Sequence, residues 1–178
     1  YTTQESDREV DSAAWQGFLQ LLKQSRPRRP INGVLLTVSV ADLLQQSTAE
    51  RDAQADAVRA RLQELHERFQ IRFPIYVLVT KADLLAGFTE FFADLGKDER
   101  AQIWGTTFAY DPDSKAPPLT AFGAEFDQLE QRLLDRLPAR LQAERDPGRC
   151  AQIFAFPQQL GILRPMLTAF LERVFAAS

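Results

Sequence analysis

The spacing of apolar residues changes several times along the chain, and each spacing predicts a different element. Over residues 10–22 the apolar positions recur at helical spacing, which predicts an amphipathic helix ending before the proline-rich residues 26–30. Residues 31–40 form a nearly continuous aliphatic and β-branched run, typical of a strand covered on both faces in a parallel sheet. A capping-box pattern at Ser47, with a glutamate three residues later, then predicts a long helix over residues 47–69.

The second half of the chain continues this alternation of strands and helices. Residues 75–80 predict a second buried strand, and residues 152–156 predict a third, short one. Apolar stripes at helical spacing over residues 122–141 and 163–175 predict two helices, the first of which is expected to kink or end early at Pro138. Helices and strands in alternation predict one α/β domain with a doubly wound, mostly parallel sheet.

Three loops follow the predicted strands, and ligands of a doubly wound sheet bind beyond the carboxyl ends of its strands. We therefore expect residues 40–42, 80–83 and 156–159 to lie close together. The second loop, Thr80-Lys81-Ala82-Asp83, is similar to the Asn/Thr-Lys-x-Asp loop that GTPases of the Ras and Rho type carry after a strand. The sequence thus predicts the later part of a P-loop GTPase-like fold.

Asp83 is the residue of this loop that is predicted to read a guanine base. A carboxylate accepts both adjacent N–H groups on one edge of guanine, and adenine offers no such pair. Lys81 is predicted to lay its aliphatic stem along the base, while Thr80 braces the neighbouring loops through its hydroxyl. The alternative for this loop is a helix-capping turn. Pro157 and Gln158 are candidates for a second base-contacting loop, although a helix start at the proline explains them equally well.

The composition restricts the chemistry further. With one cysteine and one histidine, the 178-residue chain cannot assemble a Cys/His zinc site or an internal disulfide. Its formal net charge of −3 and its dispersed basic residues give no reason to expect nucleic acid or an anionic membrane as a partner. The basic run at residues 26–29 is the one local exception, and we expect it to be a solvated linker stiffened by prolines. No apolar stretch approaches the roughly 20 residues of a membrane-spanning helix, so membrane attachment is expected only through segments outside this chain.

The phosphate-binding half of a P-loop domain is absent from the sequence. None of the eight glycines opens a Gly-x-x-x-x-Gly-Lys-Ser/Thr motif, because Gly96-Lys97 is followed by Asp98. No predicted strand ends in a magnesium-binding Asp-x-x-Gly motif, so we predict no catalytic residues and no metal ligands in this chain. GTP or ATP with Mg²⁺ is expected only in a complete domain, and this chain alone is not expected to bind nucleotide well. The unpaired edge of the first strand also predicts a domain that begins upstream of Tyr1.

Seven segments of the chain resemble one protein family, and they are residues 1–4, 29–34, 41–44, 74–85, 87–95, 99–108 and 156–159. That family is IcmF/TssM, the large inner-membrane component of bacterial type VI secretion systems. The most family-specific part is an aromatic-rich insert that has no counterpart in generic GTPases. The resemblance implies that residues 1–178 are the C-terminal portion of one GTPase-like domain on the cytoplasmic side of the inner membrane, with a helical insert at about residues 84–108. It also implies membrane anchors outside this chain.

The insert carries more aromatic side chains than a surface loop normally exposes. Phe88, Phe91, Phe92 and Trp104 are candidates for a surface that docks another secretion component. The resemblance points to the inner-membrane partner or a cytoplasmic baseplate protein as that component. The alternative is a helical cover that packs these rings, together with Phe108, on the sheet.

The resemblance implies a structural and regulatory domain that acts in assembly or docking of the type VI secretion machine. A catalytically competent GTPase or ATPase that drives or times secretion is an alternative, which intact upstream phosphate and magnesium motifs would favour. A soluble Ras-like GTPase fragment is another alternative, but it would make the aromatic insert a coincidence.

Overall fold

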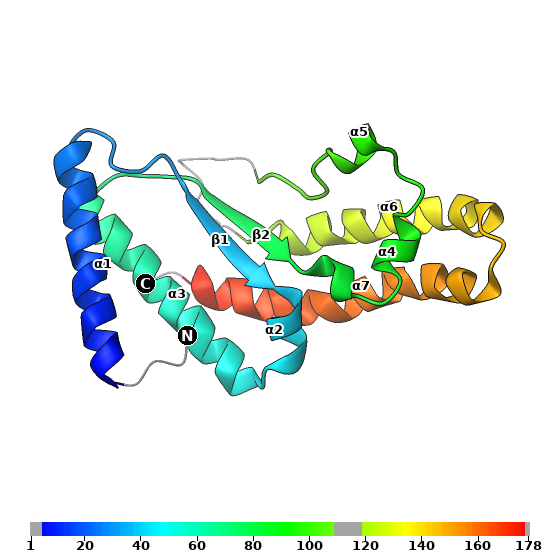
Figure 1. The fold of residues 1–178 in the computed structure, drawn as a ribbon, viewed down its shortest axis with the longest axis horizontal. Helices are drawn as coiled ribbons and strands as arrows, with labels where there is room; N and C mark the ends of the chain where they lie inside the picture. Colours follow the sequence, from blue (N-terminus) through cyan, green and yellow to red (C-terminus); the bar gives the residue numbers. More distant parts are fainter. Residues whose placement is uncertain (1–4, 109–118, 177–178) are drawn as a thin grey trace. The chain divides into compact units, whose positions relative to one another are not determined.

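The computed structural model describes residues 5–108 and 119–176, with side chains from residue 11 onward, and helices predominate in it (Figure 1). Contacts divide the chain into two units, Tyr1–Thr37 with Ala57–Leu78 (unit 1) and Val38–Asp56 with Val79–Ser178 (unit 2). The elements in chain order are α1 (Glu5–Ser25), β1 (Val34–Ser39), α2 (Val40–Gln45), α3 (Thr48–Phe69), β2 (Ile75–Thr80), the 3-10 turn η1 (Ala82–Leu84), α4 (Phe88–Phe91), α5 (Lys97–Arg100), α6 (Phe122–Ala143) and α7 (Pro147–Val174).

The sheet has two strands, so the predicted doubly wound, P-loop GTPase-like fold is wrong. β1 and β2 are parallel neighbours, and residues 5–108 and 119–176 contain no further strand (Figure 1). β2 occupies the predicted residues but is not buried as predicted, since Tyr76 and Leu78 are exposed. β1 is not covered on both faces, since Leu35 is exposed, and it is shorter than predicted. It ends early because the hydroxyl oxygen of Ser39 accepts a hydrogen bond from the backbone N–H of Asp42 at 3.3 Å, which caps α2. A sheet of two strands cannot carry helix layers in the doubly wound arrangement.

The third predicted strand, residues 152–156, lies inside α7. A short apolar run suits a buried helix as well as a buried strand, and periodicity over so few residues does not separate the two. Of the nine buried positions in α7, Pro157 and Leu171 directly follow another one, and the other seven recur in steps of three and four residues along one helix face. These positions are Ile153, Phe156, Leu160, Leu163, Leu167, Phe170 and Val174.

α7 also begins earlier than predicted, because Asp146 and Pro147 start the helix. The carboxylate of Asp146 accepts a hydrogen bond from the backbone N–H of Arg149 at 2.8 Å. Pro147 lies in the first turn, where a missing N–H leaves no helical bond unmade. The helix then continues through Pro157 and Pro165, and Pro157 is itself buried. Packing along the apolar face therefore holds one helix across positions at which prolines predict boundaries.

α6 and α7 form a helical hairpin that is joined by residues 144–146 (Figure 1, yellow and orange). α6 runs past Pro138 to Ala143 without ending early. In the connection, the carboxylate of Glu144 accepts hydrogen bonds from the backbone N–H groups of Asp146 at 3.1 Å and Arg145 at 2.9 Å. These bonds lower the pKa of Glu144, because they favour its charged form. The tight connection keeps the two helices antiparallel neighbours.

Arg164 links α7 to the first turns of α6. Its guanidinium forms an ion pair with Asp127 and donates to the main-chain oxygen of Gly123 at 3.2 Å, both in α6. The same guanidinium lies 5.7 Å from the ring centroid of Phe126, a cation–π contact. One side chain of α7 thus holds charged, polar and aromatic groups of α6 at once.

In unit 1, α1 packs on the C-terminal half of α3 through Trp15. The indole N–H of Trp15 donates to the carboxylate of Glu64 at 2.6 Å. Arg61 lies over the indole ring, 5.4 Å from its centroid, and pairs with the same carboxylate at 2.8 Å. Leu19 is fully buried one turn later. The two helices predicted over residues 10–22 and 47–69 are confirmed.

The predicted capping box at the start of α3 is also confirmed. The carboxylate of Glu50 accepts hydrogen bonds from the hydroxyl of Ser47 at 2.7 Å and from its backbone N–H at 2.8 Å. In return the backbone N–H of Glu50 donates to the hydroxyl oxygen of Ser47 at 3.3 Å. The bonds from Ser47 lower the pKa of Glu50. A local sequence signal therefore fixed this helix start correctly.

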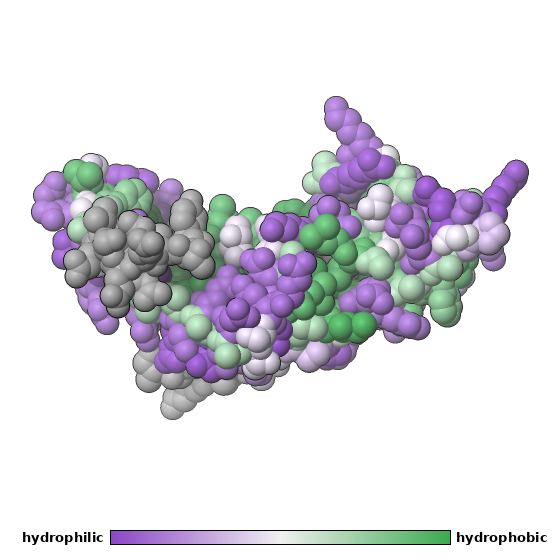
Figure 2. Space-filling model, turned by 60° about the horizontal axis from the view of Figure 1, so that its bottom comes forward, coloured by the Kyte–Doolittle hydropathy of each residue, from purple (hydrophilic) through white to green (hydrophobic). Residues whose placement is uncertain are grey.

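Within the described residues, no helix is both long and apolar enough to cross a membrane. Hydrophobic areas nevertheless appear between hydrophilic ones on the face shown in Figure 2. Single apolar side chains reach the surface in both units, for example Leu35 with 67% exposure and Ile103 with 97%. Such side chains deserve explanation only where they gather.

Candidate functional site

The residues predicted to read a base lie at the end of β2 and in η1. The hydroxyl of Thr80 donates to the main-chain oxygen of Val38 in β1 at a long 3.5 Å. Lys81 has a left-handed backbone with φ of 58°, a conformation that costs a non-glycine residue about 1–2 kcal/mol. The side chains of Lys81 and Asp83 are both exposed. Base binding by Thr80, Lys81 and Asp83 stays a prediction.

The second predicted base loop is not a loop, because Pro157 and Gln158 lie within α7. Pro157 is buried and Gln158 is exposed. α2, which contains residues 40–42, contacts both η1 and α7. The elements that hold the three predicted loops therefore adjoin in unit 2, but as packed helices and a turn.

The predicted partner residues form an aromatic cluster against α7. The ring centroid of Phe156 in α7 lies 5.2 Å from that of Phe91 and 5.6 Å from those of Phe88 and Phe92. Trp104 extends the cluster outward, with its ring centroid 5.5 Å from Phe92. Aromatic ring pairs at these separations add stability beyond that from burying their apolar surface. The segment of residues 84–108 is therefore packed on the helical hairpin, whereas the alternative of a helical cover placed it on the sheet.

Gly87 allows α4 to approach α7 this closely. Its φ is 83°, a left-handed conformation that glycine adopts without strain. A Cβ at this position would lie 2.1 Å from the main-chain oxygen of Gln152 in α7. The glycine is thus required by both its backbone angle and its neighbour.

Arg140 fixes the other side of α4. It comes from α6, is only 5% exposed, and donates to the main-chain oxygens of Phe91 at 2.8 Å and Glu90 at 2.9 Å. Asp94, just after α4, pairs with the same guanidinium at 3.3 Å. The end of α4 is therefore held by hydrogen bonds that satisfy its terminal carbonyl groups.

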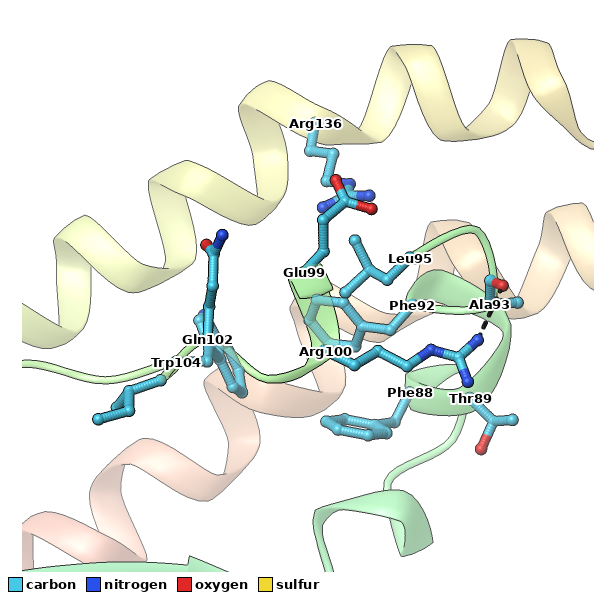
Figure 3. Close-up of a pocket in the computed structure, with 11 residues that line it drawn as sticks. Phe88, Thr89, Phe92, Ala93, Leu95, Glu99, Arg100, Gln102, Trp104 and Arg136 are labelled. Atoms are coloured by element: carbon cyan, nitrogen blue, oxygen red, sulfur yellow. Dashed lines mark hydrogen bonds between the residues drawn. The ribbon is translucent and has the colours of Figure 1, made fainter. Parts of the chain in front are cut away.

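An open cavity of about 670 Å³ lies between α4, α5 and α6, over the aromatic cluster (Figure 3). Arg136 reaches into it from α6, and Arg100 extends from α5 toward Ala93. Its principal walls are formed by the side chains of Phe88, Phe92, Leu95, Arg100, Trp104 and Arg136.

The charged groups around this cavity already have partners within the chain. Arg100 donates to the main-chain oxygen of Ala93 at 3.2 Å, and Arg136 pairs with Asp94 at 2.9 Å. The carboxylate of Glu99 accepts from the backbone N–H of Gly96 at 2.8 Å. The surface left for a ligand is therefore largely apolar.

Two apolar side chains stand at the rim of the cavity and are accessible. Trp104 is 40% exposed and Ile103 is 97% exposed. In the described part of the chain, no group of three or more His, Cys, Asp or Glu side chains could hold a metal ion. Aromatic walls, an aliphatic rim and internally paired charges favour binding of an apolar side chain from a partner.

The sequence predicted a site in the aromatic-rich segment, but it did not predict which residues line the cavity. Phe91 is fully buried and belongs to the core of the cluster, whereas Phe88 and Phe92 are half-buried in the cavity wall. Ile103 lies within the family-specific residues 99–108, but nothing in the sequence predicted that its side chain would be exposed. Arg136 enters from α6, more than thirty residues away in sequence, and no local signal pointed to it.

Comparisons with known proteins agree over nearly the whole chain. The model of the IcmF-related N-terminal domain family matches residues 8–178. A curated protein of Pseudomonas aeruginosa strain PAO1, described as type VI secretion system component TssM1, is 55% identical over 176 residues. That alignment covers 98% of this chain and 16% of the relative, so the chain spans about a sixth of the relative's length. No solved structure matches the chain.

Proposed function

The chain belongs to the IcmF-related N-terminal domain family, and from this premise we propose that it is a docking domain of a bacterial type VI secretion assembly. The relative named above is a component of such a system. We further propose that the domain works on the cytoplasmic side of the inner membrane, as part of a longer polypeptide. Its partner is then another secretion component, either an inner-membrane protein or a cytoplasmic baseplate protein.

The observation that carries this proposal is the aromatic cavity with its apolar rim. A rim residue that is 97% exposed, as Ile103 is, gains about 2 kcal/mol when a partner covers it fully. Trp104 beside it is of the residue type most enriched among the side chains that dominate binding energy. The wall beneath the rim is fixed to α6 by the Arg140 contacts with α4, and Trp104 packs on Phe92 in that wall, so little ordering is needed when a partner binds.

The full-length protein tests the proposal, with Ile103→Ser and Trp104→Ser introduced together. A strain that lacks the gene is complemented with this variant, and two quantities are measured. The first is copurification of each other type VI membrane and baseplate component with the variant protein. The second is secretion of a type VI substrate. We expect one component to be lost from the complex and secretion to fall with it.

The matched control is Leu134→Ser with Ile162→Ser in the α6–α7 hairpin. These side chains are 47% and 51% exposed and do not line the cavity, so the control also replaces two exposed apolar side chains by serine, but away from the proposed site. The purified 178-residue chain should remain folded in both double variants, which circular dichroism checks. Equal secretion and equal copurification in both strains would contradict a docking role for the cavity.

A further inference from the structure

The second candidate surface lies in unit 1, where the C-terminal ends of α1 and α3 lie close together (Figure 1). The ammonium group of Lys23, near the end of α1, donates to the main-chain oxygen of Arg68, near the end of α3, at 3.0 Å. Residues 26–33 and 70–74 follow these helices, and the backbone N–H of Val34 donates to the oxygen of Pro74 at 3.0 Å. The two connections therefore run side by side at one end of the unit.

Basic residues from both connections and both helix ends collect there. We call this group the basic end, and it is formed by Lys23, Arg26, Arg28, Arg29, Arg68 and Arg72. Residues 22–33 and 66–76 contain a single carboxylate, Glu67, so the local formal charge is +5. The whole chain carries −3, which leaves all other residues with a net charge of −8. The sequence suggested dispersed charges because this grouping joins segments about forty residues apart.

Most of these cations lack a carboxylate partner. Among the side chains that the structure describes, none forms an ion pair with Lys23, Arg26, Arg28, Arg29 or Arg68. The partner of Lys23 is a main-chain oxygen, and Arg26 contacts the amide oxygen of Asn32 at 3.5 Å. Several arginines elsewhere do have carboxylate partners, as Arg164 has in Asp127 and Arg173 has in Asp56. Charges that stay unneutralised and exposed remain free to attract an anionic partner.

Exposed apolar side chains adjoin the basic end. Phe18 is 50% exposed and Leu21 is 62% exposed. Three positions apart in α1, they share one face of the helix, about one turn before the helix ends at Ser25 and the basic connection begins. Surfaces that bind membranes peripherally combine such side chains with Lys and Arg, because the apolar groups enter the headgroup region while the cations meet the phosphates. Nucleic acid would use the cations, but it would leave these apolar groups without a partner.

We propose that the basic end binds the surface of an anionic phospholipid membrane. The interaction is electrostatic and peripheral, with Arg28 and Arg29 in the proline-bounded connection as its principal cations. It is independent of the aromatic cavity and of the docking function. The whole chain has a negative net charge, so an anionic membrane repels most of its surface. Attraction to the membrane can come only from a local cluster of cations such as the basic end.

Sedimentation with vesicles tests the proposal on the 178-residue chain. The vesicles contain phosphatidylcholine alone or phosphatidylcholine with about one-third phosphatidylglycerol, at low and at high salt. We expect binding to the phosphatidylglycerol vesicles at low salt and its loss at high salt. Each basic side chain near a membrane surface strengthens binding roughly fivefold, so Arg28→Glu with Arg29→Glu should weaken it more than tenfold.

The control variant is Arg132→Glu with Arg145→Glu in the α6–α7 hairpin, which changes the net charge equally. It should bind phosphatidylglycerol vesicles as the unmodified chain does. If circular dichroism shows that the first variant is unfolded, Arg28→Gln with Arg29→Gln takes its place. Absence of binding by the unmodified chain, or equal loss in the two charge variants, would overturn the proposal. A higher affinity for a labelled DNA duplex than for the phosphatidylglycerol vesicles would also overturn it, because that result assigns the basic end to nucleic acid.

Discussion

The guanidinium of Arg140 donates to the main-chain oxygen of Phe91 across 2.8 Å, in a position where only 5% of the arginine is exposed. This contact, with the one to Glu90, joins α6 to α4 and so positions the wall of the aromatic cavity. Replacement by methionine keeps the length of the side chain but removes every donor. The buried main-chain oxygen of Phe91 then loses the donor from α6, and that of Glu90 keeps only backbone donors such as the N–H of Ala93 at 3.5 Å.

We expect Arg140→Met to lower the free energy of unfolding by about 2–4 kcal/mol, because a buried polar group without a partner costs about 1–3 kcal/mol. Urea denaturation of the purified chain measures this value. Arg132→Met, at an exposed position of the same helix, should change it by less than about 0.5 kcal/mol. Similar losses in the two variants would mean that the buried hydrogen bonds do not stabilise α4.

Gly87→Ala should destabilise the chain by more than about 2 kcal/mol, because the new methyl group meets the main-chain oxygen of Gln152 and the backbone φ is positive. Gly17→Ala is the matched control in α1, where a Cβ meets no atom within 4 Å. Alanine is the better helix former, so this control should stabilise by up to about 1 kcal/mol. Thermal or urea unfolding distinguishes the two signs. An unchanged stability for Gly87→Ala would exclude the close approach of α4 to α7.

Elements with complete local signals were predicted correctly from the sequence. The capping box at Ser47 fixed the start of α3, and the apolar run of residues 75–80 fixed β2, because both signals lie within a few residues. Residues 152–156 were assigned wrongly for the opposite reason. Their apolar run is too short to show a period, and the prolines at 157 and 165 suggested boundaries that tertiary packing overrides.

The predicted fold class was wrong because the prediction depended on the strand at residues 152–156 and on a four-residue motif. Thr80-Lys81-Ala82-Asp83 does follow a strand, but the strand has one neighbour instead of a doubly wound sheet. The cavity was predicted only in part. Phe88, Phe92 and Trp104 stood out by composition, whereas Arg136 and Arg140 reach the site from α6 through contacts about 30 to 50 residues apart in sequence.

Stability should depend on pH through Glu144. Hydrogen bonds in the hairpin connection lower the pKa of its carboxyl below the unfolded value of about 4.3. The stabilisation is therefore fully present above that value and is lost as pH falls through the lower folded-state pKa. Glu144→Gln should lower the thermal midpoint at pH 7, and the difference from the unmodified chain should shrink below about pH 4.

Glu172→Gln provides the comparison for this pH series. Glu172 is exposed in α7, and its carboxylate makes no hydrogen bond with the residues that the structure describes. Its variant should follow the unmodified chain at every pH. A midpoint for Glu144→Gln that is the same as that of the unmodified chain at pH 7 would show that the bonds to Arg145 and Asp146 add no stability.

The predicted base contacts are testable although the fold is not P-loop-like. If Asp83 reads guanine, the chain should bind GTP more tightly than ATP, and Asp83→Ala should remove this preference. Calorimetric titration with each nucleotide measures both affinities. Equal affinities for GTP and ATP in the unmodified chain would remove the prediction for Thr80, Lys81 and Asp83 together.

The buried face of α7 constrains the length of this helix more strictly than its composition. Each residue turns a helix by about 100°, so one residue inserted between Phe156 and Leu160 would swing every later member of the face out of the core. Substitution of one aliphatic side chain by another of similar volume disturbs a single contact. Related chains should therefore vary in length at residues 144–146, or change α7 by about seven residues, which is two full turns and restores the same face.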